Sequence, residues 1–427
     1  MATRVWIGAV RPVKQVTQWL FGGTWETSDI VNVTIGSKVL SVVGGSATIT
    51  TVVDTVVSAL NAAADGEFSE ITWSRSGNYL VGTADDFGVP FTCTVSTTET
   101  GGGAADAQTI DGAASSVGTD TTACTGPNFA NVAGNWSGAT LPVDGDTVIF
   151  ADSSVDCLYG LDNNGVTPAE ILFDSSYTGM IGLPIYNENG YYEYRERFLK
   201  YCNSADATTT LVTVGQGEGT GSSRIKFNAG TGRCTVTVLN TDDPEVDGEM
   251  SFEFLGTHAS NEVNVSRGYV GLANAAGTAA TIPTLRVGYV DSIDSDSNVL
   301  CGSGATLTTI TQTGGILETR SNITTLTQNG GEHRRNAGTS TTVTLNGGEL
   351  IYNTTGTLTT LVVAGTGKAN FSADLRSKTV TNLTVNSGTS LMDPHGVVTY
   401  TNGIVFSRCR PDDVEWDAPI NKTWTPS

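Results

Sequence analysis

The side chains best suited to chemistry are few and far apart. The three histidines, His258, His333 and His395, stand alone, and none has a second histidine or a cysteine at a metal-binding spacing. The sequence also lacks a nucleophile elbow, a phosphate-binding loop and a dinucleotide-binding fingerprint. It therefore predicts no catalytic residue, no metal ligand and no cofactor.

Paired carboxylates are the one catalytic arrangement that the sequence offers. Glycoside hydrolysis needs two carboxylates roughly 5–9 Å apart, and Glu332 and Glu349 each follow a Gly-Gly pair in successive copies of a repeat. Stacked in register, they would lie about 4.8 Å apart. Aromatic side chains that could hold a sugar are sparse here, and Arg334 and Arg335 are close in sequence. We therefore interpret the two glutamates as an exposed ladder beside an arginine rather than as a catalytic pair.

Two further segments carry clusters of functional groups. Residues 242–247 and 291–298 are rich in carboxylates but lack the spacing of a known calcium loop, so we expect solvated turns. Residues 186–198 are the densest aromatic and charged segment, and Tyr and Arg are favoured at interfaces. We interpret this segment as a loop packed on the neighbouring fold or as a subunit interface, with glycan contact as the alternative. Its candidate partner-contact residues are Tyr186, Tyr191, Tyr192, Tyr194, Arg195 and Arg197.

A degenerate repeat dominates the C-terminal part of the chain. Each copy reads approximately Thr-Thr-aliphatic-Thr followed by a glycine turn, and the aliphatic anchors are separated by 16, 17, 18 and 22 residues. A period this short, with β-branched residues, is typical of one coil of a parallel β-solenoid. We expect the anchors to form one interior row, and an antiparallel sandwich is the alternative. The predicted core row is Ile310, Leu326, Val343, Leu361 and Leu383.

The remaining patterns predict how the chain is divided. Strands at residues 210–215, 263–265 and 284–288 resemble members of the same series, so we predict a right-handed β-solenoid over residues 128–427, with larger loops before residue 300. Residues 1–98 predict a small α+β domain, because alternating strands at 31–35 and 39–43 precede a helix at 51–63 with one apolar face. Residues 99–127 are mostly Thr, Ser, Gly, Ala and Asp, and we interpret them as a linker.

Composition excludes several classes of function. The 427 residues include 22 Lys and Arg against 43 Asp and Glu, a net charge of −21, which disfavours nucleic-acid binding. No apolar run approaches the roughly 20 residues that cross a bilayer, and residues 1–30 show no export signal, which a secreted adhesin would need. The seven cysteines are spread widely, so we expect reduced, mostly buried thiols in a protein that folds in the cytosol.

Two segments carry a resemblance to known proteins. Residues 134–148, Gly-Asn-Trp-Ser-Gly-Ala-Thr-Leu-Pro-Val-Asp-Gly-Asp-Thr-Val, resemble the coil-opening motif of β-helical surface and phage-associated proteins, in which Trp136 would cap the first coil. Residues 29–96 are similar to a small module of bacteriophage tail and other virion proteins. Together they resemble uncharacterised structural proteins of tailed phages and prophages. Both motifs are structural, so the resemblance implies a fold and a setting and no active-site residues.

The resemblance implies a non-enzymatic virion protein that is assembled in the host cytoplasm. We expect a capsid decoration or cement protein, or a surface-projecting protein, that docks by residues 1–98 and displays the solenoid. Its expected partners are other capsid or tail proteins and further copies of itself, a trimer being one arrangement that covers the solenoid ends; a host surface glycan is a further candidate. The alternative is a tail or baseplate receptor-binding spike with glycan-binding or polysaccharide depolymerase activity.

Overall fold

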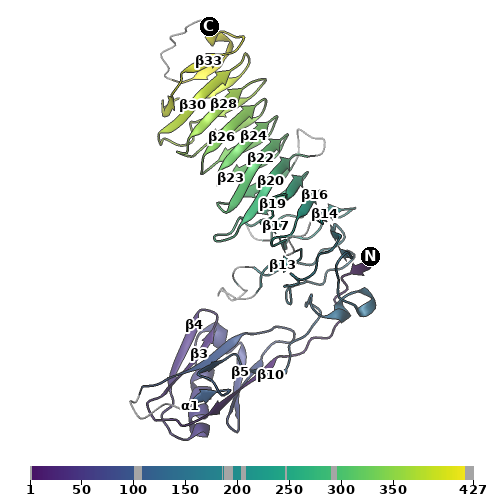
Figure 1. Cartoon of the computed structure of the whole chain (residues 1–427), viewed down its shortest axis with the longest axis vertical. Coiled ribbons are helices and arrows are strands. Elements are labelled where there is room, and N and C mark those ends of the chain that lie inside the picture. The colour runs from purple at the N-terminus through teal and green to yellow at the C-terminus, as the bar shows by residue number, and fades with distance from the viewer. Residues whose placement is uncertain are drawn as a thin grey trace.

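The computed structural model describes residues 2–100, 108–184, 186, 196–202, 208–245, 248–289 and 296–418. The described chain is mainly β, and most of it winds into a long solenoid-like body built on two parallel sheets. Figure 1 shows this body rising to the C-terminus, with a smaller α+β region at its opposite end and the N-terminus near the junction. Among the described residues, no helix is long and apolar enough to span a bilayer.

The first sheet of the solenoid has 14 strands, and each pairs in parallel with the corresponding strand of the next coil. In spatial order its strands are β1 (Thr3–Val5), β11 (Thr147–Phe150), β12 (Glu170–Asp174), β14 (Thr210–Gln216), β16 (Cys234–Val238), β18 (Glu262–Val265), β20 (Ala280–Val287), β22 (Ala305–Gln312), β24 (Ile323–Gln328), β26 (Ser340–Leu345), β28 (Leu358–Val363), β30 (Lys378–Val385) and β32 (Val398–Tyr400), with β33 (Ile404–Phe406) also pairing with β30.

The second sheet has 11 strands and supplies the other wall of the solenoid. Its strands are β13 (Leu199–Lys200), β15 (Ile225–Asn228), β17 (Phe252–Leu255), β19 (Gly268–Leu272), β21 (Ser297–Cys301), β23 (Ile316–Thr319), β25 (Glu332–Arg335), β27 (Glu349–Tyr352), β29 (Lys368–Asn370), β31 (Ser390–Met392) and β34 (Glu415–Asp417). Three short 3-10 turns lie at the two ends of the body: η1 (Ala133–Asn135), η2 (Ser137–Ala139) and η3 (Pro411–Asp413).

The interior of the solenoid consists of rows of side chains stacked from coil to coil. Strands alternate inward and outward residues, so one register error would turn an interior side chain to the surface. The register of the 14-stranded sheet instead places one aliphatic residue per coil in a single buried row. Ahead of the five predicted anchors this row contains Val148, Ile171, Val212, Val236, Val263 and Leu285.

The α+β region has two antiparallel sheets and a separate core. One sheet contains β10 (Thr119–Thr122), β2 (Val16–Gly22), β6 (Tyr79–Ala84) and β5 (Ile71–Ser76), with β8 (Thr109–Ile110) on β2; the other contains β4 (Lys38–Val43), β3 (Ile30–Ile35), β7 (Cys93–Thr98) and β9 (Ser115–Ser116). Helix α1 (Ile49–Asn61) buries Val52, Val53, Val56 and Leu60 against this core, and Val57 is partly buried. Helix α2 (Gly66–Ser69) is a single turn.

The N-terminus does not lie where the predicted boundaries put it. Thr3, Arg4 and Val5 pair in parallel with residues 147–149, so β1 belongs to the solenoid and the α+β region is inserted after it. Trp6 follows β1 into the solenoid core, where its ring lies 5.2 Å from that of Trp136. A three-residue strand whose partner is 144 positions away leaves no local sequence pattern, which is why residues 1–98 looked like one unit.

The segment predicted to be a linker also differs from the expectation. Within residues 99–127, the described part contributes β8, β9 and β10 to the sheets of the α+β region. Backbone pairing needs no apolar side chain, and Thr119 and Asp120 pair with β2 through backbone groups. The hydroxyl of Thr17 adds a hydrogen bond of 2.6 Å to the Asp120 carboxylate. Despite their low hydrophobicity, these residues are therefore part of the sheets and do not form a linker.

Two chain segments form a neck between the α+β region and the solenoid. Val13 and Thr125 form an antiparallel bridge, in which the Val13 N–H donates to the Thr125 carbonyl at 2.8 Å. The buried Asn135 side chain links both segments: its Oδ1 accepts from Val10 N–H at 2.9 Å, and its Nδ2 donates to Gly126 O at 2.8 Å. The insertion therefore leaves and re-enters the solenoid at neighbouring positions.

Candidate functional site

The five predicted core residues are brought together in one row. Each is the Cα partner of the next along β22, β24, β26, β28 and β30, and each is at most 1% exposed. Their side chains exclude water from the solenoid interior over five successive coils. This row gives the body a fixed shape, on which any surface group is held at a constant spacing.

The candidate carboxylate pair lies in register, as its spacing predicted. Glu332 and Glu349 are Cα partners on β25 and β27, and both side chains are partly exposed. Each carboxylate has a partner of its own, however. Glu332 forms an ion pair with Arg334, and Glu349 accepts a hydrogen bond of 2.7 Å from Asn370 Nδ2. Both are partnered within the wall of the solenoid, which favours a structural ladder over an acid–base pair.

The tyrosine- and arginine-rich segment is described only at its two ends. Tyr186 is 60% exposed. Arg197 turns back toward its own loop, where Nε donates to Pro184 O at 3.2 Å, and its guanidinium lies 5.9 Å from the Phe198 ring. Tyr191, Tyr192, Tyr194 and Arg195 lie outside the described residues. The base of the segment is therefore packed onto the solenoid, and Tyr186 is the described member of the predicted contact set that faces solvent.

Beside Phe198 lies a buried ion pair that the sequence did not reveal. Lys226 on β15 and Glu253 on β17 lie 2.9 Å apart, with side chains 1% and 8% exposed. The two residues are Cα partners on adjacent strands, and the ring of Phe198 lies 5.9 Å from the Lys226 ammonium. Both positions face outward from the strands, and the described residues Phe198 and Gly182 lie against Lys226 there. These neighbours shield the pair from solvent.

His333 is in the solenoid interior, in a position that aliphatic residues occupy in the adjacent coils. It lies between Leu317 and Leu350 and is fully buried. Its Nε2 lies 2.9 Å from the hydroxyl of Thr319, which also accepts a hydrogen bond from Arg335. Burial, and secondarily the Arg335 charge, lowers the pKa of His333 to about 3. The ring is therefore neutral at physiological pH.

Arg335 is a second unexpected interior residue. Its side chain is 1% exposed and donates to Ser340 Oγ at 3.0 Å, Thr319 Oγ1 at 3.0 Å and Thr339 O at 2.8 Å. Burial lowers the pKa of this guanidinium to about 10. None of the ion pairs found among the described residues includes it. Arg335 is thus held by neutral acceptors and is unavailable to the Glu332–Glu349 ladder, in contrast to Arg334.

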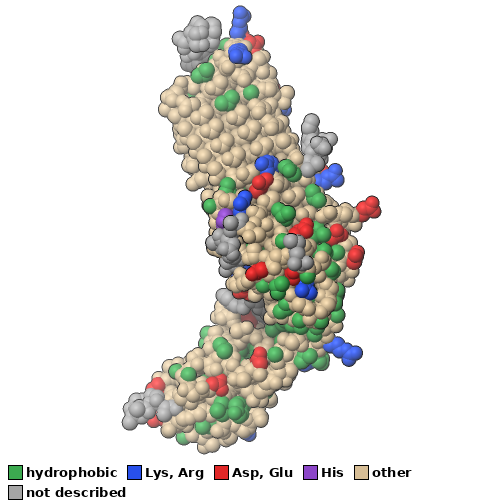
Figure 2. Space-filling model, turned by 45° about the vertical axis from the view of Figure 1, so that its right-hand side comes forward, with side chains coloured by type: hydrophobic (Ala, Val, Ile, Leu, Met, Phe, Trp, Pro, Cys, Tyr) green, Lys and Arg blue, Asp and Glu red, His purple; other side chains and the backbone are tan. Residues whose placement is uncertain are grey.

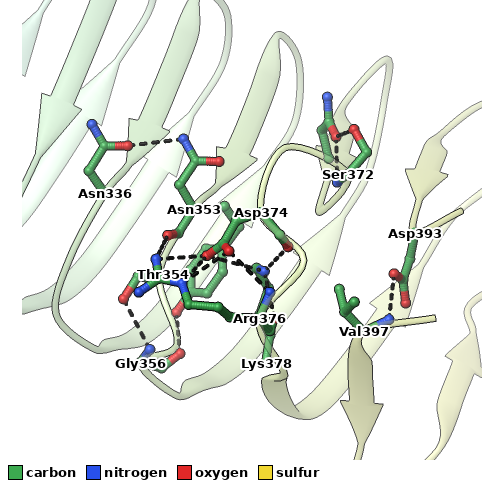
Figure 3. Close-up of polar contacts among 12 residues, drawn as sticks. Asn336, Asn353, Thr354, Gly356, Ser372, Asp374, Arg376, Lys378, Asp393 and Val397 are labelled. Atoms are coloured by element: carbon green, nitrogen blue, oxygen red, sulfur yellow. Dashed lines mark hydrogen bonds and ion pairs between the residues drawn. The ribbon is translucent and has the colours of Figure 1, made fainter. Parts of the chain in front are cut away.

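A polar cluster pins one corner loop to the preceding coil (Figure 3). Arg376 Nε donates to the two Asp374 oxygens at 3.0 and 2.9 Å, and its Nη2 donates to Asn353 O at 2.9 Å. The buried Lys378 ammonium lies 3.5 Å from Asp374. These contacts, with the Arg376 hydrogen bonds foremost, lower the pKa of Asp374 to about 2. On the same side, Asn353 Nδ2 donates to Asn336 Oδ1 at 3.0 Å, so the cluster joins successive coils.

The remaining candidate groups are not assembled into a site. In the part of the chain that the structure describes, no group of three or more His, Cys, Asp or Glu side chains could hold a metal ion. Residues 291–295 and 246–247 of the two acidic loops lie outside the described residues. The seven cysteines form no disulfide with one another: Cys93, Cys157, Cys202, Cys234 and Cys301 are buried, and Cys124 and Cys409 are partly buried.

One extended surface is chemically uniform. On β22, β24, β26, β28 and β30, the residues on either side of each interior anchor point outward and form two rows in register. Eight of these ten positions are threonine, and none of the ten is buried. We call this surface the threonine face; it consists of Thr309, Thr325, Thr342, Thr360 and Asn382 in one row and Thr311, Thr327, Thr344, Val362 and Thr384 in the other.

Charge is distributed unevenly over the solenoid. Figure 2 shows charged side chains gathered on its lower half, whereas the upper body is almost uniformly uncharged on the side in view. The threonine face contains no ionisable residue. At its edge on β20 lies Arg286, the Cα partner of Thr311. Arg286 forms an ion pair with Glu262 on β18. In a chain of net charge −21, this neutral surface is a distinct feature.

Comparison with family models, curated proteins and solved structures finds no match for this chain. The sequence could have revealed the threonine face, because its members flank the predicted anchors at fixed spacing. It gave no indication of the interior His333 and Arg335, because charged and polar residues in a strand normally mark its solvent side.

Proposed function

We propose that this chain is a non-enzymatic structural protein of a tailed-bacteriophage virion, a capsid decoration or other surface-projecting protein. In this proposal the α+β region is a domain that docks on the particle, and a right-handed β-solenoid projects from it. The observation that carries the proposal is the arrangement of the two parts: a rod with an inserted α+β region at one end, joined through a two-chain neck.

The rod supports a mechanical role. Fourteen strands of one sheet and 11 of the other stack coil on coil, and a continuous core runs through them. A solenoid of this kind is stabilised by contacts between adjacent coils, so it holds its ends at a fixed separation without a second layer of structure. Such a body suits display at a particle surface better than it suits enclosing a substrate.

The neck supports a docking role for the inserted region. The region's core is separate from that of the solenoid, and its two connections run together past Asn135. It is thus held to the rod by few contacts and can bind a partner without altering the coils. Repetition of the chain on a symmetric particle, together with self-association, would add avidity to a weak single contact. The expected partners are therefore capsid or tail proteins and further copies of the chain.

The rival function, a spike that cleaves polysaccharide, is less well supported. Glu332 and Glu349 are each bound to a different neighbour, Arg334 and Asn370. An inverting mechanism needs room for a water between the two carboxylates, and a retaining one needs a free nucleophile. Incubation with host capsule or lipopolysaccharide discriminates between the functions: shortened glycans that disappear with Glu332→Gln or Glu349→Gln would overturn the non-enzymatic proposal.

The docking role is tested by removing the inserted region. Because Val13 and Thr125 are hydrogen-bonded neighbours, residues 14–124 can be replaced by a two-residue Asn-Gly turn without moving β1. A deletion of residues 1–98 would instead remove β1 and expose the Trp136 end of the core. We expect the excised chain to keep the β signature in circular dichroism and to lose binding to particles.

Two measurements keep this test decisive. The intact chain is incubated with particles that lack it, and its density is located by electron cryomicroscopy; we expect the α+β region to be the part in contact. Particle binding that persists after excision, or density showing the solenoid in contact and the α+β region free, would refute the docking assignment. Absence of the chain from purified particles of its own phage would refute the virion proposal as a whole.

A further inference from the structure

Two cysteines from successive coils meet in the interior of the solenoid. Cys202 follows β13, and Cys234 is the first residue of β16. Both side chains are fully buried, at 0% exposure, and belong to the solenoid core. One turn of the solenoid separates them along the chain, because β14 and β15 lie between them. A bond between the two sulfurs would therefore join one coil to the next.

Thr210 holds the two cysteines on the same side of the sheet. It is the Cα partner of Cys234 on the adjacent strands β14 and β16, so the two side chains point the same way from strands about 4.8 Å apart. The Cys202 thiol donates to Thr210 Oγ1 at 3.1 Å, and the Thr210 hydroxyl donates to Pro168 O at 2.7 Å. The Cys202 sulfur is thus fixed beside the pair formed by Thr210 and Cys234.

The backbone at Cys202 has an unusual conformation. Its φ of 69° lies in the left-handed region that favours glycine. In the next coil the equivalent position, two residues beyond the pairing of β13 with β15, is Gly230, with a φ of 54°. A Cβ on Gly232 would lie 2.7 Å from the Cys202 Cβ, so the turn before Cys234 passes very close to Cys202. The first coil therefore keeps a thiol where the second coil uses glycine.

The two thiols interact directly and are not equivalent. The hydrogen bond between them lowers the pKa of Cys202 and raises the pKa of Cys234. The Thr210 hydroxyl further lowers the pKa of Cys202. Burial instead raises the pKa of Cys301, another interior cysteine, to about 12. Because the thiolate is the reactive form of cysteine, Cys202 is the member of the pair that attacks an oxidant.

We propose that Cys202 and Cys234 form a redox site, at which a peroxide converts the two thiols into a disulfide between successive coils. The Cys202 thiolate attacks one oxygen of hydrogen peroxide, the O–O bond breaks, and a sulfenic acid forms as the first water leaves. The Cys234 sulfur then displaces the sulfenic hydroxyl as a second water. The thiols lose two electrons and two protons, and the peroxide is reduced to two waters. This inference goes beyond the docking proposal and does not depend on it.

The disulfide would act as a cross-link along the solenoid. It closes the chain from residue 202 to residue 234, so these coils cannot unwind from each other while the bond is intact. A cross-link of this kind stabilises a fold mainly by restricting the unfolded chain. In a reducing cytosol the pair stays open, and in oxidising surroundings it closes. We therefore expect the oxidised chain to unfold at a higher temperature than the reduced chain, and dithiothreitol to reverse the shift.

The experiment maps the disulfide in the full-length chain. The folded protein is treated with hydrogen peroxide, its remaining thiols are blocked with N-ethylmaleimide, and it is digested with trypsin without reduction. The cleavage sites place Cys202 in the peptide 201–224 and Cys234 in the peptide 234–267, each with no second cysteine. We expect these peptides to be joined, two hydrogen atoms lighter than their sum, and to be separated by dithiothreitol. In urea, the same treatment should join many different cysteine pairs.

Two variants test the roles of the cysteines. Cys234→Ser removes the second thiol, so the cross-link should be lost and dimedone should trap a sulfenic acid on Cys202. The matched control is Cys301→Ser, which replaces an equally buried cysteine of the same core and should keep the cross-link. Circular dichroism checks that both variants fold. Should Cys234→Ser fail to fold, the peptide map of the unaltered chain decides by itself.

Three results would overturn the proposal. The first is a folded, peroxide-treated chain in which Cys202 and Cys234 are both blocked by N-ethylmaleimide and unlinked. The second is a disulfide from either cysteine to a different one, such as Cys157. The third is a cross-link that forms with equal yield in the folded and the urea-unfolded chain, or that the Cys301→Ser control loses. Since the assay reads sulfur chemistry and not binding, each outcome leaves particle docking untouched.

Discussion

The buried histidine predicts a specific pH dependence of stability. The pKa of His333 is lowered from its ordinary value of 6.5 to about 3 in the folded chain, because burial disfavours the charged ring. In the unfolded chain the ring regains its ordinary value. Below pH 6.5 the unfolded state therefore binds a proton that the folded state does not, and stability is lost as the pH falls toward 3.

The size of the effect follows from the two values. At pH 5.0 the unfolded imidazole is protonated and the folded one is not, which costs about 1.36 kcal/mol for each of the 1.5 pH units below 6.5, or about 2 kcal/mol. At pH 7.5 the contribution of the ring is fully present.

Urea unfolding at pH 7.5 and 5.0, followed by circular dichroism, measures the difference. His333→Leu places an aliphatic residue between Leu317 and Leu350 and should remove about 2 kcal/mol of the loss between the two pH values. His395→Gln, at an exposed position, is the control and should keep the full loss. An equal loss in the His333→Leu variant and in the unaltered chain would refute the reasoning, as would an imidazole that titrates near pH 6 by NMR in the folded protein.

Three other perturbations have expected outcomes. Leu326→Ala should lower the free energy of unfolding by about 2–5 kcal/mol, because the neighbouring side chains of its buried row cannot move in to fill the cavity. Thr325→Ala, on the outer side of the same strand, should lower it by less than about 1 kcal/mol. Equal effects of the two variants in urea titrations would contradict the interior row. Lys226→Ala should lower the free energy of unfolding by about 3–5 kcal/mol, because it leaves Glu253 buried without its cation. The double replacement Lys226→Met with Glu253→Leu should change the stability to thermal unfolding very little. Similar losses of stability in both variants would argue against a buried pair. Asn135→Ala should lower the free energy of unfolding by about 2 kcal/mol or more, because buried backbone groups lose their hydrogen-bond partners. It should also speed amide hydrogen exchange at the neck. Unchanged exchange would show that other contacts hold the neck together.

The C-terminal coils could be predicted because their sequence is local and repetitive. Ile310 and its four counterparts each have a threonine on at least one side and are followed by a turn, so a single coil contains the information that places its interior residue. The threonine face follows from the same pattern, since residues on either side of an inward anchor must point outward. What the pattern could not give was the identity of interior residues in the second sheet, where His333 lies between two leucines and Arg335 lies between Thr319 and Tyr352.

The N-terminal half was harder because its pairing is distant. Val5 and Ile149 are neighbours in the sheet, and nothing near either residue records this. Likewise, β8 to β10 are held by backbone hydrogen bonds in a segment whose side chains resemble those of a linker. The buried Lys226–Glu253 pair is covered from outside the strands by Phe198, which does not belong to either strand of the pair. In each case the deciding contact lies outside the window in which a sequence pattern can be read.

The position of β1 has a consequence for the order in which the chain can be completed. Thr3–Val5 is synthesised before the inserted region, and its partner strand follows about 140 residues later. The inserted region can close in the meantime, and by pairing Val13 with Thr125 it brings the waiting strand to the place where β11 will arise. Folding of the inserted region thus replaces a long loop closure by a short one. We therefore expect β1 to pair with β11 promptly only in chains whose inserted region has already folded.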